Sequence, residues 1–390
     1  MDFSTRRFDS AVGEFERQAE ELLAALRAGD NSAARVFHRL HPRFLDPAIP
    51  WLPLRVADGE IQEAALDLND ARLAVARGYD FLDWKALEEF ATVLREDAAV
   101  RAFEHAVEAV VDGDEAGLAT LIRERPELAQ GRSVRRTHFD PSVHGATLLH
   151  YVAANGVENF RQRTPGNVVA ITRLVLEAGA DPNATARLYG GECGVMSMLV
   201  SSSHPAQAGV QLELIELLAD YGASVNRVGA GNWHSPLLTA LVFGYADAAQ
   251  ALECRGARVD SLAAAAGLGR VAQAERLLPT ASPQQRHLAL ALAAQLGHPE
   301  IVRLLLDAGE DPDRFNPEGS HKHSTPLHQA ALAGHEAVVR LLVDRGARLD
   351  RKDRIYQSEP LGWAEYGGHA AIADFLRGAG SAVAKGRGEL

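Results

Sequence analysis

Residues 324–347 read Ser-Thr-Pro-Leu-His-Gln-Ala-Ala-Leu-Ala-Gly-His-Glu-Ala-Val-Val-Arg-Leu-Leu-Val-Asp-Arg-Gly-Ala, and this stretch decides the fold. Thr325 and Pro326 predict the start of a helix, because a threonine cap satisfies free amide protons and proline loses no hydrogen bond at the first helical position. Gly334 ends that helix, since glycine takes left-handed backbone angles without steric cost. The apolar stripe at 338–342 predicts a second, antiparallel helix.

The same pattern recurs along the C-terminal two-thirds of the chain. Related stretches are ITRLVLEAGADPN at 171–183, LELIELLADYGASVN at 212–226 and IVRLLLDAGEDPD at 301–313. The glycines expected to end the second helices stand at 179, 222, 256, 309, 346 and 378, which gives intervals of 43, 34, 53, 37 and 32 residues. The longest interval holds an abbreviated, alanine-rich helix pair at 261–278, and the intervals of 43 and 37 contain insertions.

This spacing resembles the ankyrin-repeat family, whose period is about 33 residues. The segment Thr325–His328 matches the signature tetrapeptide of the family, Thr147–His150 keeps its two ends, Ser235–Leu238 lacks the histidine, and Glu359–Gly362 lacks both ends. The resemblance implies an all-α solenoid of antiparallel helix pairs with an N-terminal helical cap. Inner helices would line a concave face, and β-turn fingers would project from one edge. It also implies that the signature histidine bonds loop backbone.

We expect three segments along the chain. Residues 1–100 form an N-terminal helical module or cap, residues 101–380 form a stack of about seven to eight repeats, some of them degenerate, and residues 381–390 form a disordered tail. The module would either shield the first repeat, as every finite stack requires, or serve as an independent binding domain.

The module itself shows several helix signals. Phe15–Leu26 has the pattern of an amphipathic helix, and prolines between 42 and 53 exclude a long helix there. A helix over 66–76 is followed by a break at Gly78-Tyr79 and a second helix with Asp83 as its cap. This arrangement resembles a helical module that precedes ankyrin stacks in bacterial proteins.

Composition narrows the range of partners and compartments. The net charge of −12 argues against a general nucleic-acid surface, since phosphate contacts need clustered lysine and arginine. The chain has no apolar run long enough to span a bilayer, and its first residues lack the apolar core of a secretory signal. Two cysteines provide no disulfide framework. We therefore expect a cytoplasmic protein without a membrane or nucleic-acid partner.

The expected fingers and inner helices carry aromatic and histidine side chains, which suit recognition surfaces. Only 6% of the residues are aromatic, so their presence in loops is unexpected. In ankyrin geometry these groups would border one concavity. The candidate binding residues are His150, Tyr151, Asn155, Arg161, Tyr189, His204, Trp233, His234, Phe315, His321, His323, Tyr356 and Trp363. The alternative is that the aromatic residues only stiffen neighbouring fingers.

Two insertions carry positive charge. Residues 157–167 lengthen the link between the helices of the first full repeat and include Arg161, Gln162 and Arg163. Residues 131–144 add three further arginines and His138. Such a run suits a carboxylate or phosphate ligand. The alternative is that the arginines are solvated or paired with Glu158 and Asp140.

Chemistry is less well supported than binding. His321, His323 and His328 lack partners at metal-ligand spacing, so no metal site and no cofactor are predicted. Cys193 with His204 or His234 is a remote nucleophile–base option. The first functional hypothesis is a protein or peptide partner bound by the concave face and fingers. The second is a pocket, closed by the enlarged fingers, that binds or transforms a small polar or anionic molecule through histidine, tyrosine and glutamate.

Overall fold

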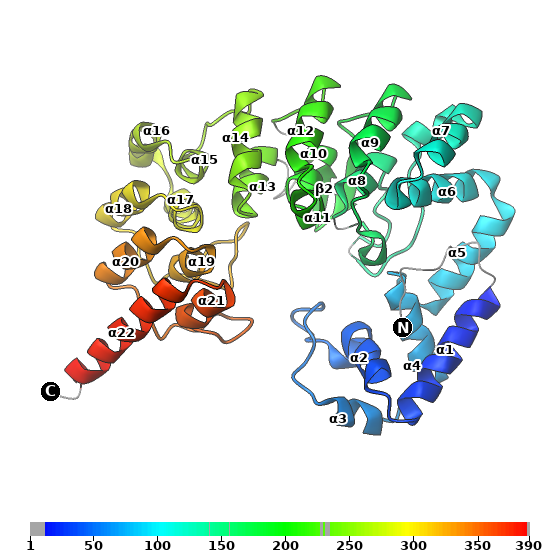
Figure 1. Cartoon of the computed structure of the whole chain (residues 1–390), viewed down its shortest axis with the longest axis horizontal. Helices are drawn as coiled ribbons and strands as arrows, with labels where there is room; N and C mark the ends of the chain where they lie inside the picture. Colours follow the sequence, from blue (N-terminus) through cyan, green and yellow to red (C-terminus); the bar gives the residue numbers. More distant parts are fainter. Residues whose placement is uncertain (1–11, 140, 156, 227–228, 231–234, 388–390) are drawn as a thin grey trace. The chain divides into compact units, whose positions relative to one another are not determined.

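The computed structural model describes residues 12–139, 141–155, 157–226, 229–230 and 235–387. They divide into two compact units, whose elements are labelled in Figure 1. Unit 1 comprises the described residues up to Ser224 and the short strand at 229–230, and unit 2 comprises residues 225–226 and 235–387. This division falls inside the repeat stack that the sequence predicts for 101–380.

Unit 1 begins with a helical module that has an apolar core of its own. Its helices are α1 (Val12–Arg27), α2 (Asn31–Leu40), α3 (Asp58–Glu63), α4 (Leu68–Gly78) and α5 (Trp84–Glu96). The core is built from side chains such as Phe15, Leu22, Phe37, Tyr79 and Leu87. Because Phe160 from the repeat region packs against the same core, the module is joined to the stack through its interior.

Local signals in the module lie close to where the sequence places them. The helix expected at 66–76 is α4, which includes Gly78 and ends before Tyr79, and Asp83 caps α5 by accepting a hydrogen bond from the amide of Ala86. The proline-rich segment holds one 3₁₀ turn, Pro42–Phe44, and an isolated bridge between Leu45 and Pro53. Prolines remove backbone donors, so no longer element forms among the described residues of this segment.

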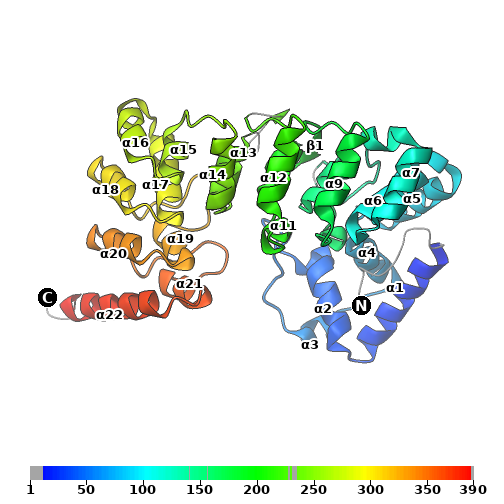
Figure 2. The same cartoon turned by 45° about the horizontal axis from the view of Figure 1, so that its top comes forward.

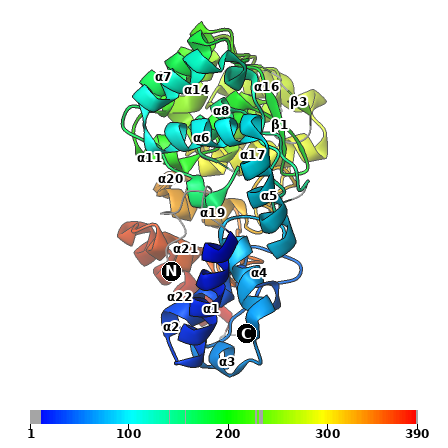
Figure 3. The ribbon, with the colours of Figure 1, turned by 90° about the vertical axis from the view of Figure 1, so that its right-hand side faces the viewer.

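The repeats of unit 1 stack in two layers. Their helices are α6 (Ala98–Asp112), α7 (Glu115–Glu124), α8 (Leu148–Ala153), α9 (Val168–Glu177), α10 (Val195–Leu199), α11 (Ser203–Gln207) and α12 (Gln211–Asp220). The helices α6, α8 and α10 contact one another in sequence, and α7, α9 and α12 form the second layer. Figure 3 shows α5 leading from the module to α6.

One finger of unit 1 is a β-hairpin. The strands β1 (Thr185–Leu188), β2 (Gly191–Gly194) and β3 (Gly229–Ala230) form an antiparallel sheet in the order β1-β2-β3. The two-residue turn has φ of 53° at Tyr189 and 73° at Gly190, as a type I′ turn requires. A bulky side chain at positive φ is strained, and such strain concentrates at functional sites. The hairpin therefore holds an exposed tyrosine in a strained conformation at its tip.

Unit 2 is a regular stack of five helix pairs among the described residues. The pairs are α13 (Pro236–Val242) with α14 (Ala246–Cys254), α15 (Leu262–Gly267) with α16 (Val271–Leu277), α17 (Pro283–Gln295) with α18 (Pro299–Asp307), α19 (Pro326–Ala333) with α20 (Glu336–Asp344), and α21 (Pro360–Tyr366) with α22 (Ala370–Arg387). Figure 2 shows these pairs lying one after another within the unit. The odd-numbered inner helices contact each other in order. The predicted mostly helical repeat solenoid is confirmed.

The deciding stretch at 324–347 folds as predicted. The helix α19 ends at Gly334 with φ of 83°, and α20 buries Val338, Val339 and Leu342 on one face. Buried alanines line the inner helices and let neighbouring repeats approach closely. The abbreviated unit at 261–278 is likewise a helix pair, α15 and α16, without a finger of its own.

Gly–His contacts connect the last four repeats of unit 2, from α15 to α22. The Nε2 atoms of three histidines donate hydrogen bonds of 2.9 Å to inner-helix carbonyls of the preceding repeat. Each imidazole also packs against a glycine of that repeat, where a Cβ atom would lie within 2.5–2.8 Å of the ring. The pairs are His298 with Gly269, His335 with Gly297 and His369 with Gly334. These corner histidines are structural.

The C-terminal end differs from the sequence pattern. The glycines at 179, 222, 256, 309 and 346 all have positive φ, but Gly378 does not. Instead, α22 continues through Gly378 to Arg387 and includes much of the tail expected to be disordered at 381–390.

Candidate interaction site

The signature histidines link each inner helix to the next finger. In His328, Nδ1 accepts hydrogen bonds from the Thr325 amide (3.3 Å) and lies 2.8 Å from its hydroxyl, which leaves Nε2 to donate to the carbonyl of Ser358 at 3.2 Å. His150 repeats this arrangement with Thr147 and the carbonyl of Cys193. Burial lowers the pKa of His150 to about 4, so this imidazole is neutral. His150 is fully buried, and its contacts are internal.

Asp353 holds the loop between α20 and α21, which we call the last finger of unit 2, in one conformation. Its carboxylate accepts hydrogen bonds from the amides of Ile355 (2.9 Å), Tyr356 (2.6 Å) and Ser358 (2.9 Å), and from Trp363 Nε1 (3.1 Å). Burial acts to raise the pKa of Asp353, but these donors outweigh it and lower the pKa below its ordinary value. The carboxylate is therefore ionised and organises the whole loop.

The ordered finger presents an aromatic group at the surface. The Tyr356 side chain is 52% exposed, and its ring packs against His323 with centroids 6.1 Å apart. His323 also contacts Trp363 at 5.7 Å, which is itself buried. Gln357, next to Tyr356, has φ of 56°, so backbone strain accompanies this presentation. Three predicted residues thus lie together, with Tyr356 outermost.

The preceding finger of unit 2 adds Phe315 and His321. The ring of Phe315 lies under the guanidinium groups of Arg354 at 4.0 Å and Arg351 at 4.6 Å, at cation–π distances. His321 donates from Nε2 to the carbonyl of Val242 at 3.0 Å, and burial lowers its pKa. The amide of Arg354 bonds the carbonyl of His323, which joins the two fingers. We call the surface formed by Phe315, His321, His323, Arg354 and Tyr356 the finger surface.

The remaining described candidates lie in unit 1. Asn155 donates to Ser201 Oγ at 2.6 Å and accepts from Tyr189 at 3.4 Å. Tyr189 is 56% exposed, and His204 is partly exposed in α11. Tyr189 and Asn155 thus form a smaller polar patch at the hairpin tip, which we call the Tyr189 patch.

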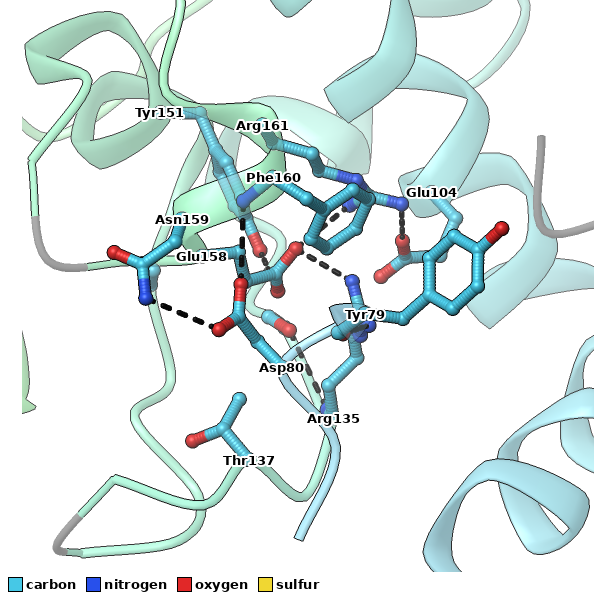
Figure 4. A network of polar contacts seen from close by, with 12 residues as sticks. Tyr79, Asp80, Glu104, Arg135, Thr137, Tyr151, Glu158, Asn159, Phe160 and Arg161 are labelled. Atoms are coloured by element: carbon cyan, nitrogen blue, oxygen red, sulfur yellow. Dashed lines mark hydrogen bonds and ion pairs between the residues drawn. The ribbon is translucent and has the colours of Figure 1, made fainter. Parts of the chain in front are cut away.

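Tyr151 and Arg161 lie in a buried ionic network, drawn in Figure 4. The Arg161 guanidinium pairs with Glu104 (2.8 Å), Glu108 (2.9 Å) and Glu158 (3.2 Å). Tyr151 donates to Glu158 at 2.9 Å. The pairing of Arg161 with Glu158, which the sequence left as an alternative to ligand binding, is thus present.

The same network encloses a second arginine. The Arg135 guanidinium pairs with Glu158 at 2.5 Å, donates to the Tyr79 carbonyl and lies 4.3 Å from the Phe81 ring. Burial acts to raise the pKa of Glu158, but Arg135 and Arg161 lower it to about 2. The paired charges therefore join α6 to the two insertions, and Arg135 links this network to the N-terminal module through the Tyr79 carbonyl.

A family model described as ankyrin repeats (3 copies) matches the chain at residues 261–353 and again at 290–384. Residues 261–384 are ankyrin repeats. No curated protein matches it. Ankyrin repeats are generally protein-interaction modules, and the matched residues include the whole finger surface.

Two of the predicted site residues, Trp233 and His234, lie outside the residues that the structure describes. The other candidates divide between the two units. His150, Tyr151 and Arg161 are buried with internal partners, so their side chains are not available at the surface. The accessible candidates are the finger surface in unit 2 and the Tyr189 patch in unit 1.

Catalytic and metal chemistry find little support. Burial raises the pKa of Cys193 to about 11, and its thiol donates to the Leu188 carbonyl at 3.5 Å, so the nucleophile option is unfavourable. No group of three or more histidine, cysteine, aspartate or glutamate residues is placed to hold a metal ion among the described residues. The helices among those residues include none that is both long and apolar enough to cross a bilayer.

Sequence reasoning missed the two aspartates that organise these regions. Asp353 stands three residues before Tyr356 in a loop, a spacing at which an aspartate commonly bonds following amides. Asp80 follows the predicted helix break, and it is buried with φ of 59°. Its surroundings come from residues far apart in sequence, so no local signal marks it.

Proposed function

We propose that this protein binds an acidic segment of a partner protein on the finger surface of unit 2. The observation that carries the proposal is the Asp353-ordered finger, which presents Tyr356 half-exposed above His323 and Trp363. A loop that is rigid before binding loses little conformational entropy on association, and tyrosine is frequent at binding hot spots.

The charge of the last finger favours an acidic partner. It contains Arg351, Lys352 and Arg354 against one carboxylate, Asp353, which is buried and internally bonded. Arg354 is exposed while its guanidinium covers Phe315. A partner segment with aspartate or glutamate beside an aromatic or aliphatic residue would match both features.

The Tyr189 patch in unit 1 is a second surface for the same function. The strained backbone at Tyr189 supports it, because a tyrosine in a type I′ turn is retained against a conformational cost. Asn155 supplies a polar group in contact with Tyr189.

A peptide-display selection against the immobilised full chain tests the proposal. We expect enriched peptides to carry acidic residues, and Tyr356→Ala to lower their affinity by about tenfold or more, as truncation of a hot-spot tyrosine does. The matched control is Tyr366→Ala, which removes an 89% exposed tyrosine of unit 2 outside the fingers. Equal binding by Tyr356→Ala and the parent, or equal losses in both variants, would overturn the proposal.

A further inference from the structure

A cleft of about 900 Å³ opens between the N-terminal module and the first full repeat of unit 1. Its walls come from α2, the segment 45–53, the end of α4 and the two insertions at 138–139 and 159–163. Protein sites for small molecules occupy about 300–1,000 Å³, and they form preferentially where two structural parts meet. The cleft has the size of a small-molecule site.

The lining is strongly cationic in a protein whose net charge is −12. Four arginines line the cleft, namely Arg35, Arg39, Arg77 and Arg163, against a single carboxylate, Asp80. Arg163 pairs with Asp112 at 3.0 Å and Arg35 with Asp58 at 3.5 Å. Within the described part of the chain, neither a hydrogen bond nor an ion pair engages the guanidinium groups of Arg39 and Arg77.

Arg77 gives the sharpest indication of a ligand. Its Nε atom is buried and has no hydrogen-bond partner among the described residues. Burial lowers the pKa of this guanidinium, while Asp83 and Asp80 partly oppose the effect from a distance. A buried donor without an acceptor is costly, so native structures rarely leave one unmatched. An oxyanion in the cleft would pair with the Arg77 guanidinium and neutralise its charge.

Asp80 does not fill that role. Its carboxylate accepts from Asn159 Nδ2 at 3.1 Å and from the Phe160 amide at 3.3 Å. Both donors belong to the inserted loop, so Asp80 fixes the loop that forms one wall. Its φ of 59° adds backbone strain at the same place.

The cleft also offers an apolar side. Trp51 is 63% exposed, and Phe139 and Phe160 line the cleft as well. Arg35 and Arg39 lie one helical turn apart on α2 and so project from one face. A ligand that carries an oxyanion at one end and a flat apolar body at the other would use both sides.

We propose that the module cleft binds a small molecule that combines a phosphate or carboxylate group with a flat apolar part. Arg77 and Arg39 hold the oxyanion, and Trp51 contacts the apolar part. This site lies wholly in unit 1, and it is independent of the finger surface proposed for a protein partner.

Calorimetric titration of the full chain tests the proposal with three probes that share a phenyl ring: phenyl phosphate, benzoate and neutral benzyl alcohol. We expect saturable binding of phenyl phosphate, benzoate or both, and none of benzyl alcohol. Binding of phenyl phosphate alone assigns a phosphate ligand, and binding of benzoate alone assigns a carboxylate ligand. If neither anion binds, or if benzyl alcohol binds equally well, the proposal fails.

Variants assign the binding to the cleft. Arg39→Gln and Arg77→Gln should each weaken it by about tenfold or more, because each removes a charged donor. Arg17→Gln is the matched control, since Arg17 lies on α1, pairs with Glu21 and does not line the cleft. Arg39 has no hydrogen-bond or ion-pair partner to lose among the residues that the structure describes, so Arg39→Gln keeps the test valid if Arg77→Gln fails to fold. Equal affinities in Arg39→Gln, Arg17→Gln and the parent would overturn the proposal.

Discussion

The guanidinium of Arg135 and the carboxylate of Glu158 form an ion pair 2.5 Å long in which neither side chain is exposed to solvent. Removing one member of such a pair leaves a buried charge uncompensated. We therefore expect Glu158→Gln to lower the free energy of unfolding by about 3–5 kcal/mol, measured by urea denaturation. Tyr151 and Arg161 would lose a partner at the same time.

The matched control is Glu89→Gln, which breaks the exposed pair between Glu89 and Arg136 at 3.4 Å. Exposed pairs contribute about 0–1 kcal/mol, so this change should be nearly neutral. Equal midpoints for the two variants would show that the buried network contributes nothing beyond a surface pair.

Asp80 should make the folded state less stable as pH rises, which is the reverse of the usual effect of a carboxylate. Burial and the neighbouring Glu158 raise its pKa to about 7, although Arg135 and the donors Asn159 and Phe160 act the other way. The folded state therefore binds a proton more tightly than the unfolded state. The free energy of unfolding should fall between about pH 4 and about pH 7, by up to about 1.4 kcal/mol for each pH unit.

Asp80→Asn tests this dependence because asparagine tolerates a positive φ and cannot ionise. His138, whose Nδ1 lies 3.9 Å from Asp80, stays neutral in this range, since burial and Arg77 lower its pKa to about 4. We expect the variant to be more stable than the parent at about pH 8, with the difference shrinking toward about pH 5 in thermal melts. Parallel profiles for the two proteins would contradict the assignment.

The contact between His335 and Gly297 predicts a non-additive pair of mutations. In Gly297→Ala the new Cβ would lie 2.6–2.9 Å from the His335 ring, while the same change at Gly309 meets no atom within 4 Å. Both glycines have positive φ, so both variants carry about 1–2 kcal/mol of backbone strain. The excess loss of stability in Gly297→Ala measures the clash.

Adding His335→Ala removes the ring and with it the clash. Alone, His335→Ala should cost about 1 kcal/mol for its hydrogen bond to the Gln295 carbonyl. The double variant should then be more stable than the sum of the two single changes predicts, in denaturant titrations. Strict additivity would mean that the two residues do not couple the repeats.

The repeat fold can be predicted from the sequence because each sequence signal for a helix or a turn acts locally. A cap such as Thr325, the glycine after each helix and the apolar stripe of 338–342 all act within one turn or one helix pair. The prediction that a helix ends at Gly378 is wrong, because glycine permits a turn but does not impose one, and α22 continues through it. Whether a helix ends there depends on the packing of neighbours.

The candidate sites are harder to predict from the sequence because they are built from side chains of segments that lie far apart in it. The histidines and tyrosines were marked by residue type alone, which does not separate the buried His150 from the exposed Tyr356. The sequence indicates that the insertions are basic, but it does not indicate that Arg161 pairs internally or that Arg77, from another segment, lines the cleft. Tertiary burial, which sequence spacing does not report, decides between these outcomes.

A substitution at Asp353 tests the order of the last finger while the exposed Tyr356 side chain is kept. Asp353→Ala leaves four donors without their acceptor, including Trp363 Nε1, and should lower the free energy of unfolding by about 3 kcal/mol. Asp344→Ala, an exposed aspartate at the end of α20, is the control and should be nearly neutral. The two changes are compared by urea denaturation with tryptophan fluorescence as the probe.

The pH dependence of this finger has the opposite sign to that of Asp80. Because the pKa of Asp353 is lowered in the folded state, its contribution is complete above its ordinary pKa of 3.8 and is lost as pH falls further. At neutral pH, Asp353→Ala should also weaken binding of a selected acidic peptide while Tyr356 remains, because the loop must then be ordered on association. Unchanged affinity in Asp353→Ala would show that the finger needs no prior ordering to bind.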